Sequence, residues 1–204
     1  MTVTAKQATR RLDPEVRKHM ILDQAAILVA AEGISAVTME RIGREAGVSK
    51  PLVYAYFANV TTLLQELLLR DQRRLWELQT MAVSEAKDFD ELIRFTTRTY
   101  LKHAEKNGMH IQRLMSDPSI AVVFQDSERQ SRQRVVEFLA KELAHSYNVP
   151  RDVAILATEV SMGMTGAAGE LVASGAVSSK KIEEIVICLF KGSTASLREQ
   201  YGKR

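Results

Sequence analysis

The sequence predicts an all-α protein of about nine helices, in which three short helices precede a larger helical domain. Apolar residues recur at helical spacing in almost every segment, and no segment alternates apolar and polar residues as a half-buried strand does. Prolines and glycines fall at the ends of the periodic segments, where helices begin and end. Of the 204 residues, 46% are apolar and 26% are charged, which is enough apolar surface to build a core.

The N-terminal part of the chain carries clear signals for three helices. Asp13 can cap a first helix from Pro14 to Ala31, which has one apolar face and is closed by Gly33. The second and third helices are each preceded by a hydroxyl residue that can serve as N-cap: Thr38 for a helix to Ala46, and Ser49 for a helix from Lys50 to Phe57.

The remainder reads as longer helices. The first has an apolar stripe from Leu64 to Leu78, and its arginines, Arg70 among them, are expected off that stripe. The further helices are expected at residues 88–107, ended by Gly108, then 109–115, 119–147 with a break near Asp126, 150–174, and from Ser178 or Ser179 to Tyr201. The predicted organisation is an arm at 1–12, a three-helix domain at 13–60 and a larger domain at 61–204.

The formal charge of +3 is concentrated at the start of the chain. Residues 1–11 contain Lys6, Arg10 and Arg11 and no acid, so the remaining 25 of the 28 basic side chains balance the 25 acidic ones. A basic arm ahead of a folded domain can reach an anionic polymer. A solvated tail without a partner is the alternative.

The second and third helices have the arrangement of a helix-turn-helix. Gly47 permits the positive φ that a tight turn requires. On the third helix, Tyr54 and Tyr56 are two residues apart, about 200° around the helix, so both cannot face one core. Packing within the small domain is the alternative for either ring.

The outward side chains of the third helix suit DNA. Lys50 can donate to guanine and Leu52 and Ala55 can touch thymine methyls, while the two tyrosine hydroxyls can donate to phosphates. Pro51 is tolerated in a first turn.

The stretch Thr38–Phe57, TMERIGREAGVSKPLVYAYF, resembles the DNA-binding signature of the tetracycline-repressor (TetR) family of bacterial regulators. The matching pattern is Thr, then Ile-Gly-x-x-Ala-Gly-Val-Ser, then Tyr-x-Tyr-Phe, and the resemblance covers about residues 14–70. It implies a DNA-binding site formed by Lys6, Arg10, Arg11, Thr38, Ser49, Lys50, Pro51, Leu52, Tyr54, Ala55, Tyr56 and Thr61.

The chain departs from the family pattern in two places. Pro51 stands where Gly or Ala is usual. Val60 stands where the family usually has a lysine that contacts phosphate, and Asn59, Thr61 or Thr62 can cap the next helix or bond phosphate instead.

The resemblance also implies a C-terminal domain that dimerises through its last two helices and encloses a small-molecule cavity. Helical spacing predicts a dimer interface of Gly169, Ala173, Ile182, Ile185, Val186, Leu189 and Leu197. The glycine-containing face of the helix before the last one would let a partner helix approach closely. A monomer that buries these faces internally is the alternative.

A cavity lining is predicted from a second, mixed face of the helix at 88–107 and from adaptable Met and Phe side chains. Its members are Phe95, Thr99, His103, Met115, Phe124, Met162 and Gly166. The expected effector is apolar or amphipathic. Any single Met or Phe among them can equally belong to the core.

The sequence offers little for catalysis. The four histidines lack metal-ligand spacing, and Cys188, the one cysteine, lies in an apolar stretch where a buried, inert thiol is expected. No cofactor, metal or enzyme activity is predicted, and the absence of a signal peptide and of disulfides favours a bacterial cytoplasmic protein. The expected function is a homodimeric, operator-binding regulator, most simply a repressor released by a small effector. An activator, or an all-helical binding protein or enzyme with a vestigial DNA domain, is the alternative.

Overall fold

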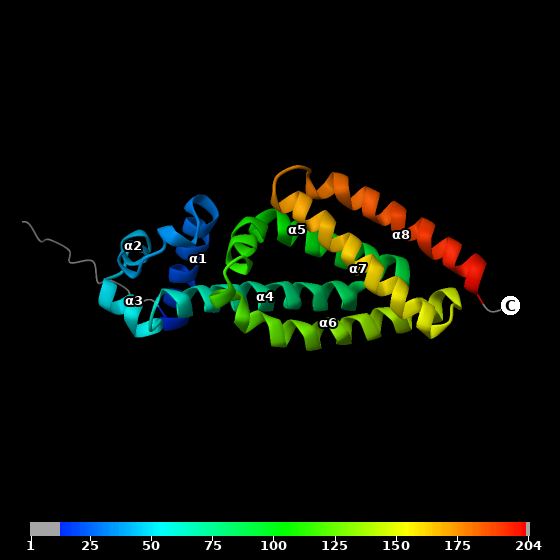
Figure 1. Cartoon of the computed structure of the whole chain (residues 1–204), viewed down its shortest axis with the longest axis horizontal. Coiled ribbons are helices and arrows are strands. Elements are labelled where there is room, and N and C mark those ends of the chain that lie inside the picture. Colours follow the sequence, from blue (N-terminus) through cyan, green and yellow to red (C-terminus); the bar gives the residue numbers. More distant parts are fainter. Residues whose placement is uncertain (1–12, 203–204) are drawn as a thin grey trace, which may run out of the picture.

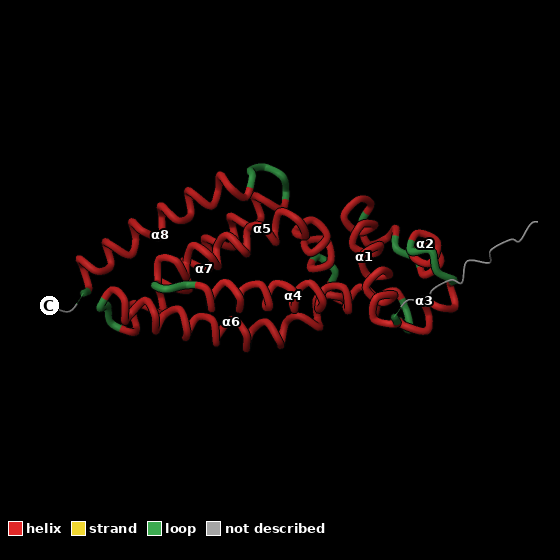
Figure 2. Tube along the Cα trace, turned by 180° about the vertical axis from the view of Figure 1, so that it is seen from behind, coloured by secondary structure: helices red, strands yellow, loops and turns green. Residues whose placement is uncertain are grey.

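The computed structural model describes residues 13–202, apart from the side chains of residues 125–130. Within that range the chain forms helices and loops and no strand (Figure 2), which confirms the predicted all-α class. The elements are α1 (Pro14–Glu32), the 3-10 turn η1 (Ile34–Ala36), α2 (Met39–Glu45), α3 (Lys50–Tyr56), α4 (Val60–Glu85), α5 (Phe89–Met115), α6 (Pro118–Tyr147), α7 (Arg151–Ala173) and α8 (Ser179–Tyr201).

The three short helices lie together at one end of an elongated molecule (Figure 1). Helix α4 leaves this group and runs along the length of the larger part, with α6 beside it, and α5, α7 and α8 complete the bundle. Helix α4 therefore belongs to both parts of the molecule.

Most helix starts follow the sequence signals. The side chains of Asp13, Thr38 and Asn59 accept hydrogen bonds from backbone N–H groups in the first turns of α1, α2 and α4, at 2.8, 3.1 and 2.8 Å. Ser49 occupies the N-cap position of α3, but its side chain makes no capping hydrogen bond. The expectation of a Ser49 side-chain cap was wrong. The third helix also ends at Tyr56, one residue before the predicted end.

Helix α5 continues through Gly108, where the sequence predicted an end. A Cβ built on Gly108 would collide with the Cβ of Ala173 on α7, so the glycine allows the two helices to approach closely. A glycine inside a helix costs about 1 kcal/mol relative to alanine, and this close packing offsets the cost. Helix α6 is likewise continuous, without the break expected near Asp126.

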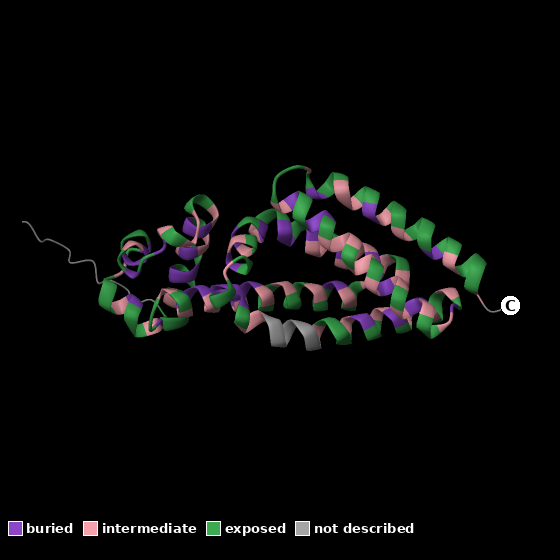
Figure 3. Ribbon diagram, viewed as in Figure 1, coloured by how far each residue is buried: buried purple, intermediate pink, exposed green. Residues whose placement is uncertain are grey.

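One apolar core fills the three-helix end and continues along the first half of α4 (Figure 3). It includes Ile21 of α1, Ile42 of α2, Val53 of α3 and Leu64 of α4, all at most 1% exposed, and it reaches Leu114 of α5. The two parts of the molecule therefore share buried contacts through α4 and α5.

Arg70 was predicted to lie off the apolar stripe of its helix, but it is buried and only 4% exposed. Its Nη1 donates to the Asp23 carboxylate of α1 at 2.7 Å and its Nε lies 3.3 Å from the carboxylate of Asp71. Ion pairing on both sides accounts for an arginine in this position.

No single helix within residues 13–202 is long and apolar enough to cross a membrane. The consecutive helices α3 and α4 meet those criteria only as a pair, which is bent by 59°.

Candidate functional site

The turn between α2 and α3 has a backbone geometry that favours glycine at two positions. Gly47 has φ 67°, which favours glycine. A Cβ on Gly43 would lie 2.9 Å from the carbonyl oxygen of Val48, so this position also excludes a side chain. The two glycines fix how α3 is presented to the surface.

Helix α3 has one buried side and one open side. Val53 and the following Phe57 are 0% and 1% exposed and anchor the helix on the core. The predicted contact residues Lys50, Pro51 and Ala55 are exposed. The open side is therefore free to enter a groove of DNA.

The two tyrosines of α3 differ in exposure. Tyr54 is 49% exposed, whereas Tyr56 is partly buried, packs against the core and lies with its ring centroid 6.3 Å from that of Phe57. Leu52 is also half-buried. Tyr54 is thus the more accessible of the two hydroxyl-bearing rings.

A shallow hollow of about 560 Å³ lies between α2, α3 and the start of α4. Its lining includes the predicted residues Thr38, Lys50 and Tyr54, and also Arg41 and Arg44, which the sequence reading missed. Arg41 and Arg44 are three residues apart on α2, so they lie on the same face of the helix. This spacing is the sequence signal that could have identified them.

The basic groups at this hollow are partly paired. The Arg41 guanidinium bonds both carboxylate oxygens of Glu32, at 2.8 and 2.5 Å, and this hydrogen bonding lowers the pKa of Glu32. The Lys50 ammonium lies 3.5 Å from the Glu40 carboxylate. Because the Lys50–Glu40 pair is exposed and the Arg41–Glu32 pair is partly exposed, phosphate can compete for both cations.

The remaining predicted DNA contacts lie around this face or outside the described range. Ser49 and Thr61 are exposed. Val60 lines the hollow, where the family's usual lysine would stand. The calls on Lys6, Arg10 and Arg11, and on an arm at 1–12, lie outside the described residues.

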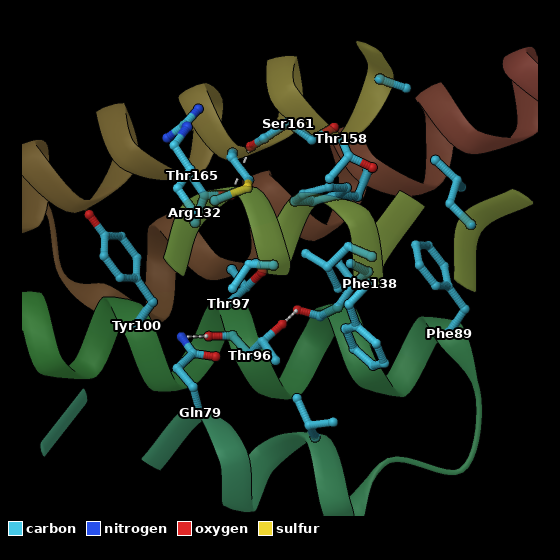
Figure 4. Close-up of a pocket in the computed structure, with 18 of the residues that line it drawn as sticks. Gln79, Phe89, Thr96, Thr97, Tyr100, Arg132, Phe138, Thr158, Ser161 and Thr165 are labelled. Carbon is cyan, nitrogen blue, oxygen red and sulfur yellow. Dashed lines mark hydrogen bonds between the residues drawn. The ribbon is translucent and has the colours of Figure 1, made fainter. Parts of the chain in front are cut away.

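The second candidate site is a cavity of about 950 Å³ inside the larger part of the molecule (Figure 4). All five long helices α4 to α8 line it. Its walls are largely apolar, with rings from Trp76, Phe89, Tyr100, Phe138 and Phe190. A cavity of this size and character suits a small organic molecule.

Hydroxyl groups are spread over the cavity wall. Thr96 and Thr97 come from α5, Thr158 and Thr165 from α7, and Thr194 from α8. The charged residues in the described lining are Arg132 and Arg134, both on α6. The site can therefore hydrogen-bond a ligand at several heights, and its described lining offers no carboxylate to one.

The structure places only two of the predicted effector-binding residues, Met162 and Gly166, in this lining. The others lie elsewhere along the bundle: Phe95, Thr99, His103, Met115 and Phe124 are absent from the cavity wall. The cavity faces the side of α5 that carries Ile93, Thr96, Thr97 and Tyr100. The mixed face of this helix, from which the sequence predicted a cavity lining, is therefore not the side that lines this cavity.

The predicted dimer residues fall on two sides of the last two helices. A Cβ on Gly169 would lie 2.6 Å from the Tyr100 ring, and Ala173 packs against Gly108, so both face α5 of the same chain. Ile182 and Val186 join an internal cluster, and Leu197 lines the cavity. The glycine-containing face was expected to meet a partner helix, and that expectation was wrong.

A different apolar strip on α7 and α8 is exposed in the single chain. On α7, Leu156, Val160 and Leu171 are 68, 75 and 47% exposed, and on α8 the predicted Ile185 and Leu189 are 46 and 53% exposed. Gly163 of α7 and Gly192 of α8 have nothing within 4 Å of a built Cβ. This strip, Leu156, Val160, Gly163, Leu171, Ile185, Leu189 and Gly192, is called the α7–α8 strip below.

Cys188 is exposed on α8 rather than buried as expected. The apolar stretch of α8 around Cys188 therefore lies partly on the exposed side of the helix. Among the described residues no three His, Cys, Asp or Glu side chains gather as a metal site would require.

These features define a class: an all-helical protein with a helix-turn-helix at one end and an internal cavity at the other. The family model described as "Bacterial regulatory proteins, tetR family" matches residues 21–67. The nucleoid occlusion factor SlmA of Vibrio vulnificus is 25% identical over 169 residues, 78% of this chain and 84% of that protein. The HTH-type transcriptional repressor SCO4008 of Streptomyces coelicolor is 32% identical over 92 residues, 45% of each chain.

The fold is also that of solved regulators. A TetR-like transcriptional regulator from Rhodococcus sp. RHA1 superposes with a TM-score of 0.72 at 23% identity, over 91% of this chain and 99% of that one. Residues 21–67, which hold the helix-turn-helix, match the tetR family of bacterial regulatory proteins, and the chain as a whole has the fold of a TetR-like transcriptional regulator.

Proposed function

We propose that the protein is a homodimeric repressor that binds a pseudo-palindromic operator and is released from it by a small apolar or amphipathic effector. The observation that carries the proposal is the path of α4. One continuous helix, Val60–Glu85, has its first half in the core beneath the helix-turn-helix and its second half in the cavity wall. A ligand in the cavity thus touches the element that supports α3.

The proposed division of the chain is an arm at 1–12, a DNA-binding domain at 13–60 and an effector-binding and dimerisation domain at 61–204. In the DNA-binding domain Lys50, Leu52 and Ala55 read bases, and Tyr54 holds phosphate. Tyr56 contributes more to packing than to DNA, because its ring is partly buried.

Two residues outside the predicted set extend this face. Arg41 and Arg44 line the same hollow as Lys50 and Tyr54. Arginines at the edge of a recognition helix contact the DNA backbone and strengthen binding without specifying bases. They supply positive charge beside Val60, where the family's usual lysine is missing.

The α7–α8 strip is the proposed dimer surface. Its members are exposed apolar residues on two helices that contact each other, with glycines that let a partner helix come close. A two-fold dimer through this strip places two copies of α3 for two half-sites. Val160→Glu should give a monomer by sedimentation, whereas Val122→Glu, at an exposed apolar position of α6, should leave the dimer intact.

Effector binding acts as a shift between two arrangements of the dimer. The ligand stabilises an arrangement whose two α3 helices no longer match the half-site spacing. The coupling free energy is RT times the natural logarithm of the factor by which the effector weakens operator binding, and operator DNA weakens effector binding by the same factor.

The test is titration of operator fragments, selected from genomic DNA, with the full chain at low salt. The double variant Lys50→Ala plus Tyr54→Phe should lose operator affinity by at least about tenfold while ligand binding is unchanged. Lys180→Ala, an exposed lysine on α8, is the matched control. Failure of the full chain to bind any DNA fragment tightly, while a ligand still binds, would contradict the proposal and favour a binding protein with a vestigial DNA domain.

A further inference from the structure

Two threonines in the cavity wall differ from the other hydroxyl residues there. Thr97 of α5 is 4% exposed and Thr158 of α7 is 6% exposed, and both line the cavity. Neither hydroxyl has a hydrogen-bond partner among the backbone and side-chain groups that the structure describes, which leave out the side chains of residues 125–130. The two labelled side chains lie on different helices on either side of the cavity in Figure 4.

Their neighbours show the contrast. The hydroxyl of Thr96 donates to the Leu92 carbonyl at 2.7 Å, and that of Thr194 donates to the Phe190 carbonyl at 2.9 Å. The hydroxyl proton of each of these threonines is already donated to a backbone carbonyl of its own helix. Thr97 and Thr158 keep both the donor and the acceptor capacity of a hydroxyl.

Buried polar groups are almost always hydrogen-bonded, and leaving one unpaired costs free energy. In a cavity this large, water can serve both hydroxyls in the empty state. A ligand that displaces this water gains affinity only if it offers an atom that replaces the lost hydrogen bonds. The two hydroxyls therefore select a ligand with a polar atom at their level.

The charges of the wall restrict that polar atom further. The charged lining residues in the described part of the chain are Arg132 and Arg134, and Arg132 already pairs with Glu159 of α7 at 2.7 Å. Among the side chains that the structure describes, the lining provides no carboxylate for a ligand cation. An ammonium group would lose its hydration without gaining a counter-charge.

We propose that Thr97 and Thr158 form the polar subsite of the cavity, and that the effector is an apolar molecule that carries a hydroxyl or carbonyl oxygen within its body and no positive charge. This proposal rests on the effector-binding role assigned to the cavity above. It goes further by naming the ligand atom that is recognised and the two side chains that recognise it.

A matched set of probes tests the chemistry. Dibutyl ketone, dibutyl sulfide and dibutylammonium share two butyl arms and differ only at the central group, which is a strong acceptor, a weak acceptor or a cation at neutral pH. Trp76 is the one tryptophan of the chain and lines the cavity, so its fluorescence reports occupancy. Dibutyl ketone should bind most tightly and dibutylammonium should bind least tightly.

The variants Thr97→Val and Thr158→Val keep the side-chain shape and remove the hydroxyl. Each should weaken dibutyl ketone binding about three- to tenfold, the range expected for one hydrogen bond, and leave dibutyl sulfide within about twofold. Thr96→Val is the matched control, because Thr96 is adjacent to Thr97 and its hydroxyl already donates to the Leu92 carbonyl. It should change neither affinity by more than about twofold.

The outcomes separate this inference from the proposed function. If a probe binds in the cavity but the ketone has no advantage, if dibutylammonium binds as tightly, or if Thr96→Val weakens the ketone as much as Thr97→Val does, the polar subsite is wrong while an effector cavity stands. If no probe changes Trp76 fluorescence or thermal stability even near its solubility limit, both the subsite and the effector-binding role are overturned. Circular dichroism and the melting temperature of each variant show whether it is folded.

Discussion

The guanidinium of Arg70 on α4 donates to the carboxylate of Asp23 on α1, with 2.7 Å between Nη1 and Oδ1. The same guanidinium neighbours Asp71, whose other carboxylate oxygen lies 2.5 Å from Nε2 of His110 on α5. These four residues, called the junction network below, connect a helix of the DNA-binding end to the two helices that continue into the cavity wall. Three of them, Arg70, Asp71 and His110, are at most 4% exposed.

Asp71→Asn should destabilise the fold by about 3 kcal/mol, because it leaves a buried arginine with one carboxylate partner, Asp23, that is itself half exposed. Urea unfolding followed by circular dichroism measures this free energy. Glu66→Gln is the matched control, since Glu66 pairs with Lys18 at a partly exposed site and should cost less than about 1 kcal/mol. Equal effects of the two variants would show that the junction network stabilises the fold no more than a partly exposed ion pair does.

Stability should fall as the pH drops below about 6.5, the value for an unperturbed histidine, in a way that depends on His103. Burial lowers the pKa of His103, and His110, Arg74 and Lys106 lower it further, against the opposing charge of Asp71. A depressed folded-state pKa means that the unfolded chain binds the proton more readily. Protonation then favours unfolding, from pH about 6.5 down to the folded-state pKa.

The measurement is the free energy of unfolding at pH 7 and at pH 5. His103→Gln should reduce the difference between these two values, while His145→Gln, at an exposed position of α6, should leave it unchanged. The buried Nε2 of His103 has no partner among the described residues, so the neutral ring is the form that fits. An identical pH dependence in the His103→Gln variant and the parent would refute this account.

Two glycines on α7 should respond in opposite directions to alanine. At Gly169 a Cβ would lie 2.6 Å from the Tyr100 ring, so Gly169→Ala should cost about 1–3 kcal/mol through overpacking. At Gly166, which faces the cavity, nothing lies within 4 Å, so Gly166→Ala should gain up to about 1 kcal/mol of helix propensity. Thermal or urea unfolding distinguishes them, and a gain at Gly169 would mean that Tyr100 is not held in place.

Arg44→Ala should weaken operator binding at every sequence tested and lower the slope of log affinity against log salt by about 1. Arg44 lines the hollow beside α3, where a guanidinium meets phosphate. Operator titrations at several salt concentrations give the slope. Arg151→Ala, at the exposed start of α7, should leave the slope unchanged, and an unchanged slope for Arg44→Ala would remove this residue from the DNA-binding face.

Local signals allowed much of the DNA-binding end to be predicted. The Thr38 cap and the positive φ of Gly47 depend on residues adjacent in sequence, and the structure has both. Ser49 occupies the predicted N-cap position, but its side-chain hydrogen bond is absent, because a residue can occupy that position without one. Arg41 and Arg44 lie on α2, outside the third helix and its flanking residues, so the outward pattern of the third helix did not predict them.

The larger end was harder, because the side of a long helix that meets a cavity, a neighbour or a partner is decided by packing between distant segments. Thr97 and His103 lie on one helix, yet only Thr97 faces the cavity. The Gly169 face was expected to meet a second subunit, whereas Tyr100 of the same chain fills that space. Arg70 showed the same limitation, since its burial depends on Asp23, far away in sequence.

The uninterrupted course of α4 means that a sideways displacement of its cavity end would tilt the helix about its buried end. Leu64 lies in the core under the DNA-binding helices and Gln79 in the cavity wall, separated along the rod by about 22 Å at 1.5 Å per residue. A displacement of about 2 Å at the cavity end therefore corresponds to a tilt of about 5° about the buried end. In the proposed two-fold dimer, the same tilt in both subunits would change the separation of the two α3 helices by twice the displacement of one.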